Sequence, residues 1–350
     1  MPTRRTELTE IVTGLATMGF QNIERALEVQ PRGLLHVGPE QYEMLTAELE
    51  SGKFDHEFST AWANGVAFAE AQDGLRGRPP WSVEWKGNHK PPGYEQIPAD
   101  LRIDHVYLIS CKYRSKILHN ASPDNLFIRL LADRVSTGNA GWYQEIAPDA
   151  YQAFYKTCRD HLGRSMFPAR ITDLEDSHVL SLRSGLPRRL TGVLGEAYAT
   201  FSQTVARKTA HMWRATMATS RQREEMLWRL LRLESAPYFV LGESISSDPL
   251  RYRVATPWDF RLRYVFHDLT VAASSDTQQP VIEWTAIVRN RSTETFEEVS
   301  GHVEVRWSHG RFGRSPEAKV YLNTAHHDVP GYLPLDAKPT ADVAPMRLFE

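Results

Sequence analysis

Apolar residues recur at helical spacing along the first part of the chain. Leu8, Ile11, Leu15 and Met18 are three or four positions apart, which is typical of one helix face and predicts a helix over about 7–27. After a break rich in glycine and proline, the same spacing predicts a second helix at about 40–49 and a third at about 54–72.

The pattern then changes to alternation. Residues 81–86 alternate apolar and polar side chains, and 100–103 and 106–113 also read as strands. Ser122-Pro123 is a good helix start, because serine caps a first turn and proline suits its first position. Further along, residues 140–235 are predicted to be almost wholly helical, with helices at about 143–162, 190–217 and 222–233.

From residue 236 onward short β-rich runs are separated by turn residues, which favours an antiparallel sandwich or barrel-like domain. The last residues, about 336–350, read as a tail or partner-binding arm. The predicted fold class is therefore α+β, divided into N-terminal helices (1–50), an α/β core (51–135), a helical insertion (136–235) and a C-terminal antiparallel β-rich domain (236–350). The β-rich runs are 238–241, 261–266, 269–272, 281–288, 302–307 and 319–322.

Composition indicates a folded protein with room for two domains. The chain has 350 residues, 41% of them hydrophobic and 10% aromatic. No apolar run approaches the ~20 residues needed to cross a bilayer, so no membrane association is expected. Only Cys111 and Cys158 are present, and a disulfide framework is not expected. A reducing, cytoplasmic setting fits this composition best.

Charge is nearly balanced overall, at −2, but not along the chain. Residues 181–232 hold ten Lys and Arg against three acids, a local charge of about +7. Such a stretch either follows a phosphate backbone or forms a solvated helix face balanced by acids elsewhere. The candidate nucleic-acid contacts are Arg188, Arg189, Arg207, Lys208, Arg214 and Arg221 in this stretch, with Arg306, His309 and Arg311 in the β-rich part.

Candidate chemistry is concentrated in residues 97–113. If 104–106 form a three-residue hairpin turn, Asp100 lies across from Ser110 with their Cβ atoms ~5 Å apart, and Lys112 lies on the same face. If 104–112 were one strand, Asp104 and Ser110 would be ~20 Å apart and could not share a cation. A two-residue turn would put Asp100 on the opposite face. We therefore favour Asp100 as the metal-binding acid, with Asp104 in the turn.

This layout resembles the core of the PD-(D/E)XK nuclease superfamily over roughly residues 54–131. The shared features are the αβββα order, an aspartate that closely follows a proline, and a lysine at the end of the next strand. The resemblance implies that Asp100 is the principal metal ligand, that Lys112 is the catalytic lysine and that Glu57 is the acid of the first helix. The chain departs from the motif at Ser110, where a second acid is expected.

Three explanations of Ser110 remain open. The missing carboxylate comes from elsewhere, with Glu84 and Glu57 as the obvious suppliers; the metal is bound more weakly, through water; or the fold is catalytically inactive and serves binding. Histidines around His302 do not have the spacing of a structural zinc site.

The resulting hypothesis is a cytoplasmic endonuclease that cuts DNA with Mg²⁺ or Mn²⁺. Asp100 holds the cation with Glu84 or Glu57, Lys112 assists the attacking water, and Ser110 plays a supporting role. By analogy only, such architectures serve restriction, phage defence or repair. The alternative is a non-catalytic subunit that binds nucleic acid or a partner. A helicase or ATPase subunit and a homo-oligomer are the possible assembly partners.

Overall fold

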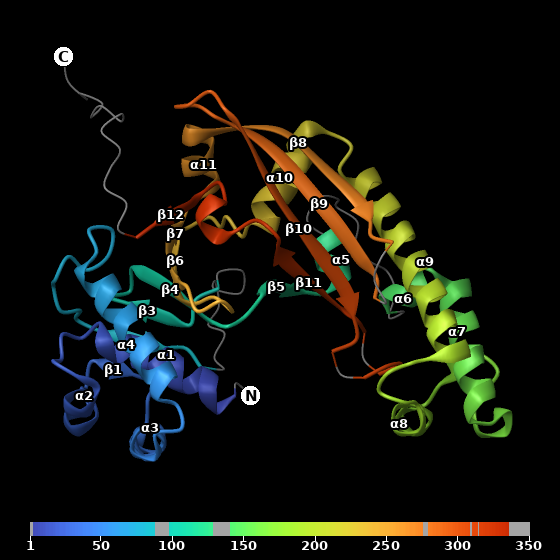
Figure 1. The fold of residues 1–350 in the computed structure, drawn as a ribbon, viewed down its shortest axis with the longest axis horizontal. Coiled ribbons are helices and arrows are strands. Elements are labelled where there is room, and N and C mark those ends of the chain that lie inside the picture. Colours follow the sequence, from blue (N-terminus) through green and yellow to red (C-terminus); the bar gives the residue numbers. More distant parts are fainter. Residues whose placement is uncertain are drawn as a thin grey trace.

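The computed structural model describes residues 3–87, 98–128, 141–275, 279–308, 310–313 and 315–335. The predicted contact residue His309 and the predicted terminal arm at 336–350 lie outside these ranges. The molecule is elongated, with a mixed sheet at one end, an antiparallel sheet in the middle and a group of helices at the other end (Figure 1).

Four helices and a short strand come before the first hairpin. The stripe that begins at Leu8 forms a helix that ends at Ala16 rather than near residue 27, because the chain turns at Gly19 with φ +82°. A new helix starts where the Asn22 side chain accepts a hydrogen bond from the Arg25 N–H. These elements are α1 (Arg4–Ala16), α2 (Ile23–Val29), β1 (Leu34–Leu35), α3 (Pro39–Ser51) and α4 (Asp55–Glu70).

Three antiparallel strands follow: β2 (Val83–Trp85), β3 (Leu101–Ile103) and β4 (Tyr107–Tyr113). Residues 104–106 form the turn between β3 and β4, with Asp104 and His105 at φ 51° and 60°. Leu101 pairs with Ile109. The predicted three-residue turn is confirmed.

The first sheet is mixed, in the order β1-β2-β3-β4-β6-β7-β12. Its centre is a parallel pair, because β6 (Tyr238–Glu243) runs alongside β4 in the same direction. Next to β6 lie the antiparallel strands β7 (Pro249–Val254) and β12 (Tyr332–Pro334). The two central strands therefore end at the same edge of the sheet.

The second sheet is wholly antiparallel, in the order β5-β11-β10-β9-β8. Its inward positions alternate with outward ones, and Val299, Val303 and Val305 of β10 are fully buried. Its strands are β5 (Ile117–Ala121), β8 (Tyr264–Ala273), β9 (Val281–Asn290), β10 (Phe296–Arg306) and β11 (Glu317–Leu322).

The described residues between β5 and β6 are mainly helical. Ser122 caps the first of these helices as predicted, accepting a hydrogen bond from the Asn125 N–H. The helix predicted at 143–162 is two helices, because Pro148 disfavours helical backbone at Ala147 before it. These helices are α5 (Pro123–Phe127), α6 (Trp142–Ile146), α7 (Pro148–Leu162), α8 (Asp176–Gly185), α9 (Gly192–Thr216) and α10 (Ser220–Leu230); α11 (Pro257–Arg263) follows β7.

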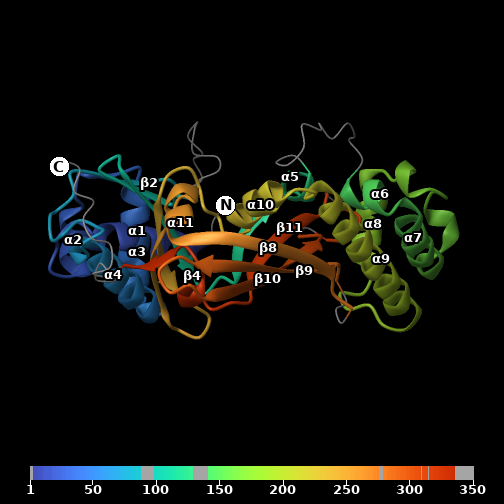
Figure 2. The same cartoon turned by 90° about the horizontal axis from the view of Figure 1, so that it is seen from above.

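Two hydrophobic cores cover opposite faces of the first sheet. One core joins α1 and α4 to the face that carries Ile109 and Phe239. The other joins the face that carries Leu108 and Val240 to the second sheet and to the helices after β5. In Figure 2 the second sheet lies between the N-terminal helices and α7–α9.

The strand pairings cross the domain boundaries predicted at 50, 135 and 235. β1 precedes residue 50 yet pairs with β2, and β5 of the predicted core belongs to the second sheet. β6, β7 and β12 of the predicted C-terminal domain belong to the first sheet. The expected α+β class is confirmed, and the structure shows that its strands form one mixed and one antiparallel sheet. Among the described residues, no helix combines the length and apolar character needed to cross a membrane.

Candidate active site

Asp100 lies at the start of β3, across from Ser110. Its N–H donates to the carbonyl oxygen of Ile109 at 2.7 Å, which extends the β3–β4 ladder by one residue. Its carboxylate accepts hydrogen bonds from the Cys111 N–H at 2.6 Å and from the Ser110 hydroxyl at 3.4 Å. Ser110 is fully buried, and its hydroxyl donates to Asp100, the predicted metal ligand.

Lysines approach Asp100 from both neighbouring strands. Burial raises the pKa of Asp100, and the charge of Lys112 on β4 is the strongest opposing influence, followed by the Cys111 N–H. A weaker opposing charge comes from Lys86, whose N–H donates to the Asp100 carbonyl at 2.9 Å from the strand on the other side. The charges of Lys112 and Lys86 therefore both act on Asp100.

A cavity the size of one water lies beside Lys112. Ser110 and Lys112 line this cavity of about 20 Å³. A cavity of this size holds one water when polar groups line it.

Glu10 is the acid that the structure brings to this group. It lies on α1, is 7% exposed, and accepts a hydrogen bond from the Trp85 indole at 2.8 Å. Burial and then the charge of Asp100 raise the pKa of Glu10 to about 8, while Lys112 lowers it. Sequence reasoning missed Glu10; the one available signal was a carboxylate between Leu8 and Ile11, inside the apolar stripe.

Glu84 and Glu57 do not join Asp100 in a three-carboxylate site. Among the described residues, no group of three or more His, Cys, Asp or Glu could hold a metal. Glu84 pairs with Arg102 at 2.6 Å and His105 at 2.9 Å. Glu57 pairs with Arg5 at 2.5 Å. Each carboxylate already faces a cation of its own, and the prediction that either one helps Asp100 to hold a metal stays a prediction.

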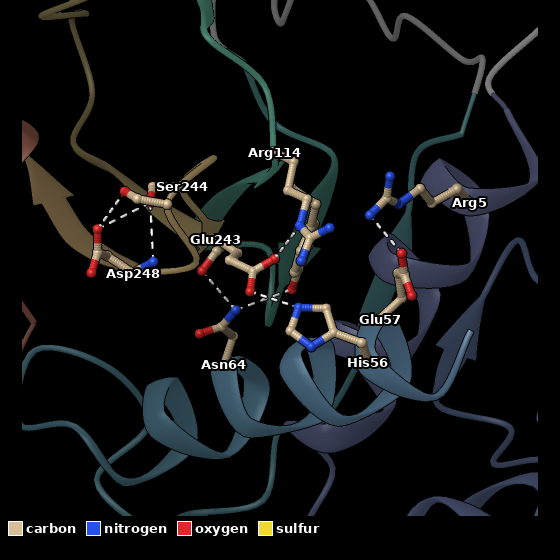
Figure 3. A network of polar contacts seen from close by, with 11 residues as sticks. Arg5, His56, Glu57, Asn64, Arg114, Glu243, Ser244 and Asp248 are labelled. Atoms are coloured by element: carbon tan, nitrogen blue, oxygen red, sulfur yellow. Dashed lines mark hydrogen bonds and ion pairs between the residues drawn. The ribbon is translucent and has the colours of Figure 1, made fainter. Parts of the chain in front are cut away.

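A second polar network lies at the same edge of the sheet (Figure 3). The nearly buried Glu243, at the end of β6, accepts hydrogen bonds from His56 at 2.7 Å and Arg114 at 2.9 Å. Burial tends to raise the pKa of Glu243, but these two partners outweigh it and lower the pKa. Asn64 on α4 donates to the Gly242 carbonyl at 2.9 Å. The network ties α4 to the ends of β4 and β6.

The predicted nucleic-acid contacts separate into a group and several scattered residues. Arg188, Arg306 and Arg311 line one groove. Arg221 on α10 pairs with Glu225 at 2.8 Å, and Arg214 on α9 donates to the Val271 carbonyl at 3.4 Å. The remaining candidates, Arg189, Arg207 and Lys208, are exposed on the loop before α9 and on α9 itself.

Comparisons with family models, with curated proteins and with solved structures found no match to this chain.

Proposed function

We propose that the protein is a metal-dependent nuclease that hydrolyses DNA phosphodiester bonds at the edge of the first sheet. The observation that carries this proposal is the electrostatic coupling of the Asp100 carboxylate to Lys112 and to a second buried acid, Glu10. Two carboxylates that are coupled to one lysine suit the cleavage of a negatively charged ester, because a cation and an ammonium both offset its charge.

The residues present fit a hard divalent cation. Mg²⁺ keeps several waters and takes only one or two protein carboxylates when substrate phosphates complete its shell. Glu10 and Asp100 would supply those two carboxylates. A bound Mg²⁺ or Mn²⁺ would polarise the phosphate and lower the pKa of a water.

The chain's own groups would position the reactants. The Cys111 N–H at 2.6 Å fixes the Asp100 carboxylate, leaving its other oxygen for a ligand. Lys112 would orient a water in the cavity that it lines with Ser110 and would offset charge on the phosphate. In this proposal, Ser110 supports Asp100 rather than binding the cation itself, and the acid missing from β4 comes from α1.

Fold architecture also supports the proposal. The chain runs from helices through three antiparallel strands, then through β5 of the second sheet and a group of helices to β6, which lies parallel to β4. This order extends the αβββα order on which the resemblance to the PD-(D/E)XK superfamily rests. Edges where parallel strands end are frequent ligand sites in mixed α/β sheets.

The test is plasmid cleavage with Mg²⁺ or Mn²⁺. Asp100→Asn, Glu10→Gln and Lys112→Met should each lower the cleavage rate at least about 100-fold. Glu57→Gln removes the same charge from a carboxylate paired with Arg5 and serves as the control, with an expected change below about threefold. Circular dichroism checks that each variant is folded. Wild-type rates in the Asp100 and Lys112 variants would refute the assignment.

The buried, uncharged Ser110 favours one alternative, a non-catalytic DNA-binding subunit. A serine satisfies Asp100 by hydrogen bonding, so the group could persist for stability alone. A calorimetric titration with Mn²⁺ separates the two functions. Binding that Asp100→Asn abolishes supports the nuclease, whereas DNA binding without any cation binding or cleavage supports the alternative.

A further inference from the structure

A basic groove lies away from Asp100, in the lobe that the second sheet forms with α7–α9. It has a volume of about 710 Å³ and runs between the α8–α9 region and the ends of β10 and β11. Its charged and aromatic lining residues are Arg183, Arg188, Arg306, Arg311, Lys319, Tyr198 and Trp307.

The groove concentrates positive charge. Five cations line it, and none of the described lining residues is an acid. Arg306 and Lys319 have acidic neighbours on their own strands. In the part of the chain that the structure describes, no acid pairs within 4 Å with Arg183, Arg188 or Arg311. A solvated helix face would spread such charges along one helix. Here the charged residues come from segments more than 100 residues apart and line the same groove.

Arg311 is held in a fixed orientation. It donates to the carbonyls of Pro187 at 3.1 Å and Arg188 at 3.0 Å, and its guanidinium lies over the Tyr198 ring at 5.6 Å. A guanidinium fixed before binding loses little side-chain freedom when a phosphate arrives.

The position of the Arg183 side chain depends on a neighbouring glycine. Gly310 has φ +90°, and a Cβ there would lie 2.5 Å from the Arg183 Nε atom. The absent side chain lets Arg183 lie against the backbone at the groove wall.

Aromatic rings form the rest of the wall. Trp307 packs on Tyr143 with ring centroids 4.7 Å apart and on Phe312 at 5.6 Å, so its ring is braced from behind. Tyr198 packs on Phe154 at 5.2 Å. Both rings remain partly exposed. Cations next to braced, partly exposed rings are the combination that binds single-stranded nucleic acid.

We propose that this groove binds the phosphates and bases of unpaired nucleotides, either within a single strand or as a free nucleotide. Its volume lies within the range of small-ligand pockets, and duplex bases are not free to stack on its rings. The inference goes beyond the proposed nuclease function, because this binding needs neither a cation nor Asp100.

Fluorescence anisotropy of a labelled 12-mer oligo(dT), in EDTA, tests the proposal. Arg183→Gln/Arg188→Gln removes two exposed cations and should weaken binding at least tenfold. Lys156→Gln/Arg170→Gln removes two exposed cations of the same lobe outside the groove and should change binding less than threefold. Asp100→Asn should bind like wild type, which separates this result from a failure of the nuclease proposal.

Competition identifies the source of the ligand. Unlabelled oligo(dT) and ATP compete in separate titrations, with a duplex of the same length as a third competitor. The proposal is supported if unlabelled oligo(dT) or ATP displaces the labelled strand and if this displacement is lost in the groove variant. The competitor that displaces it identifies the source of the ligand. Preference for the duplex, or equal weakening in groove and control variants, overturns it.

Discussion

Glu10 is an acid that burial holds in its neutral form. Its pKa of about 8 in the folded chain lies far above the ordinary value of 4.5. The folded state therefore keeps a proton that the unfolded chain loses, so between those two pH values stability falls as pH rises. A buried acid with a raised pKa is therefore unfavourable for folding at neutral and alkaline pH. Such unfavourable residues are common in functional sites that need a buried charge.

Replacing Glu10 with Gln should stabilise the protein at alkaline pH. Gln keeps an oxygen for the Trp85 indole but carries no charge, so the free energy of unfolding should rise by roughly 2 kcal/mol or more at pH 8.5 and change little near pH 4.5. Urea denaturation across this pH range measures the effect. Glu50→Gln, on an exposed residue of α3, should leave the pH dependence unchanged. Equal stability of Glu10→Gln and wild type at pH 8.5 would contradict the assigned pKa.

Cation binding should release a proton from the same residue. A ligand carboxylate must be deprotonated, so at pH 7 each cation bound should displace nearly one proton from Glu10. Affinity for Mn²⁺ should then rise about tenfold from pH 6 to pH 7 and level off above pH 8. Calorimetry in buffers of different ionisation enthalpy counts the protons. No proton release, or unchanged release in Glu10→Gln, would exclude Glu10 as a ligand.

Among the elements, the β3–β4 hairpin sets the geometry of the site. The Asp104 carboxylate in its turn accepts hydrogen bonds from the N–H groups of Trp81 at 2.6 Å and Ser82 at 3.0 Å. It also pairs with Arg78 at 2.6 Å. The turn residue therefore also fastens β2 to the hairpin.

Asp104→Ala should destabilise the protein by about 1–3 kcal/mol. Alanine removes the acceptor of two backbone N–H groups and is strained at φ 51°. Asp104→Asn keeps an acceptor oxygen and tolerates that φ, so it should cost less than about 1 kcal/mol. Equilibrium urea denaturation gives both values. Equal costs for the two variants would mean that the Arg78 ion pair, not the backbone contacts, gives Asp104 its role.

Gly242 sets the spacing of the central parallel pair. A Cβ at this position would lie 1.9 Å from the Lys112 carbonyl oxygen, so Gly242→Ala must push β4 and β6 apart at the lysine. We expect a loss of about 2 kcal/mol or more in stability and a loss of cleavage. Gly301→Ala, which meets the Tyr321 carbonyl at 2.2 Å in the second sheet, is the matched control. It should lose comparable stability yet keep cleavage below its melting temperature.

Local signals in the sequence predicted local structure. The turn at 104–106 and the Ser122 cap depend on neighbouring residues, and both are found where expected. β5 was missed because its partner, β11, lies about 200 residues further along the chain. The site divides in the same way: Asp100 and Lys112 share one hairpin, whereas Glu10 reaches them only through the packing of α1. Helical periodicity predicts which face of a helix is buried, but it does not predict which residues that face packs against.

At the scale of the whole molecule, each sheet is built from both halves of the chain. β6 and β7 extend the sheet begun by β2–β4, and β5 closes one side of the sheet formed by β8–β11. Neither sheet is complete within a continuous segment. Unfolding either half of the chain would leave an open strand edge in the other.

This interdependence predicts that residues 236–350 cannot fold alone. As a separate fragment it would lack β4 beside β6 and β5 beside β11, which leaves two strand edges unpaired, and it would lack the helices that help to bury Val240 and Val320. The fragment should show little amide protection in hydrogen exchange, whereas in the full chain Ile109 and Val303 should lose protection at the same urea concentration. Adding residues 1–235 should restore protection to the fragment. A fragment protected by itself would show that the second half is an autonomous domain, and the contacts across β4–β6 would then join two finished units rather than complete one.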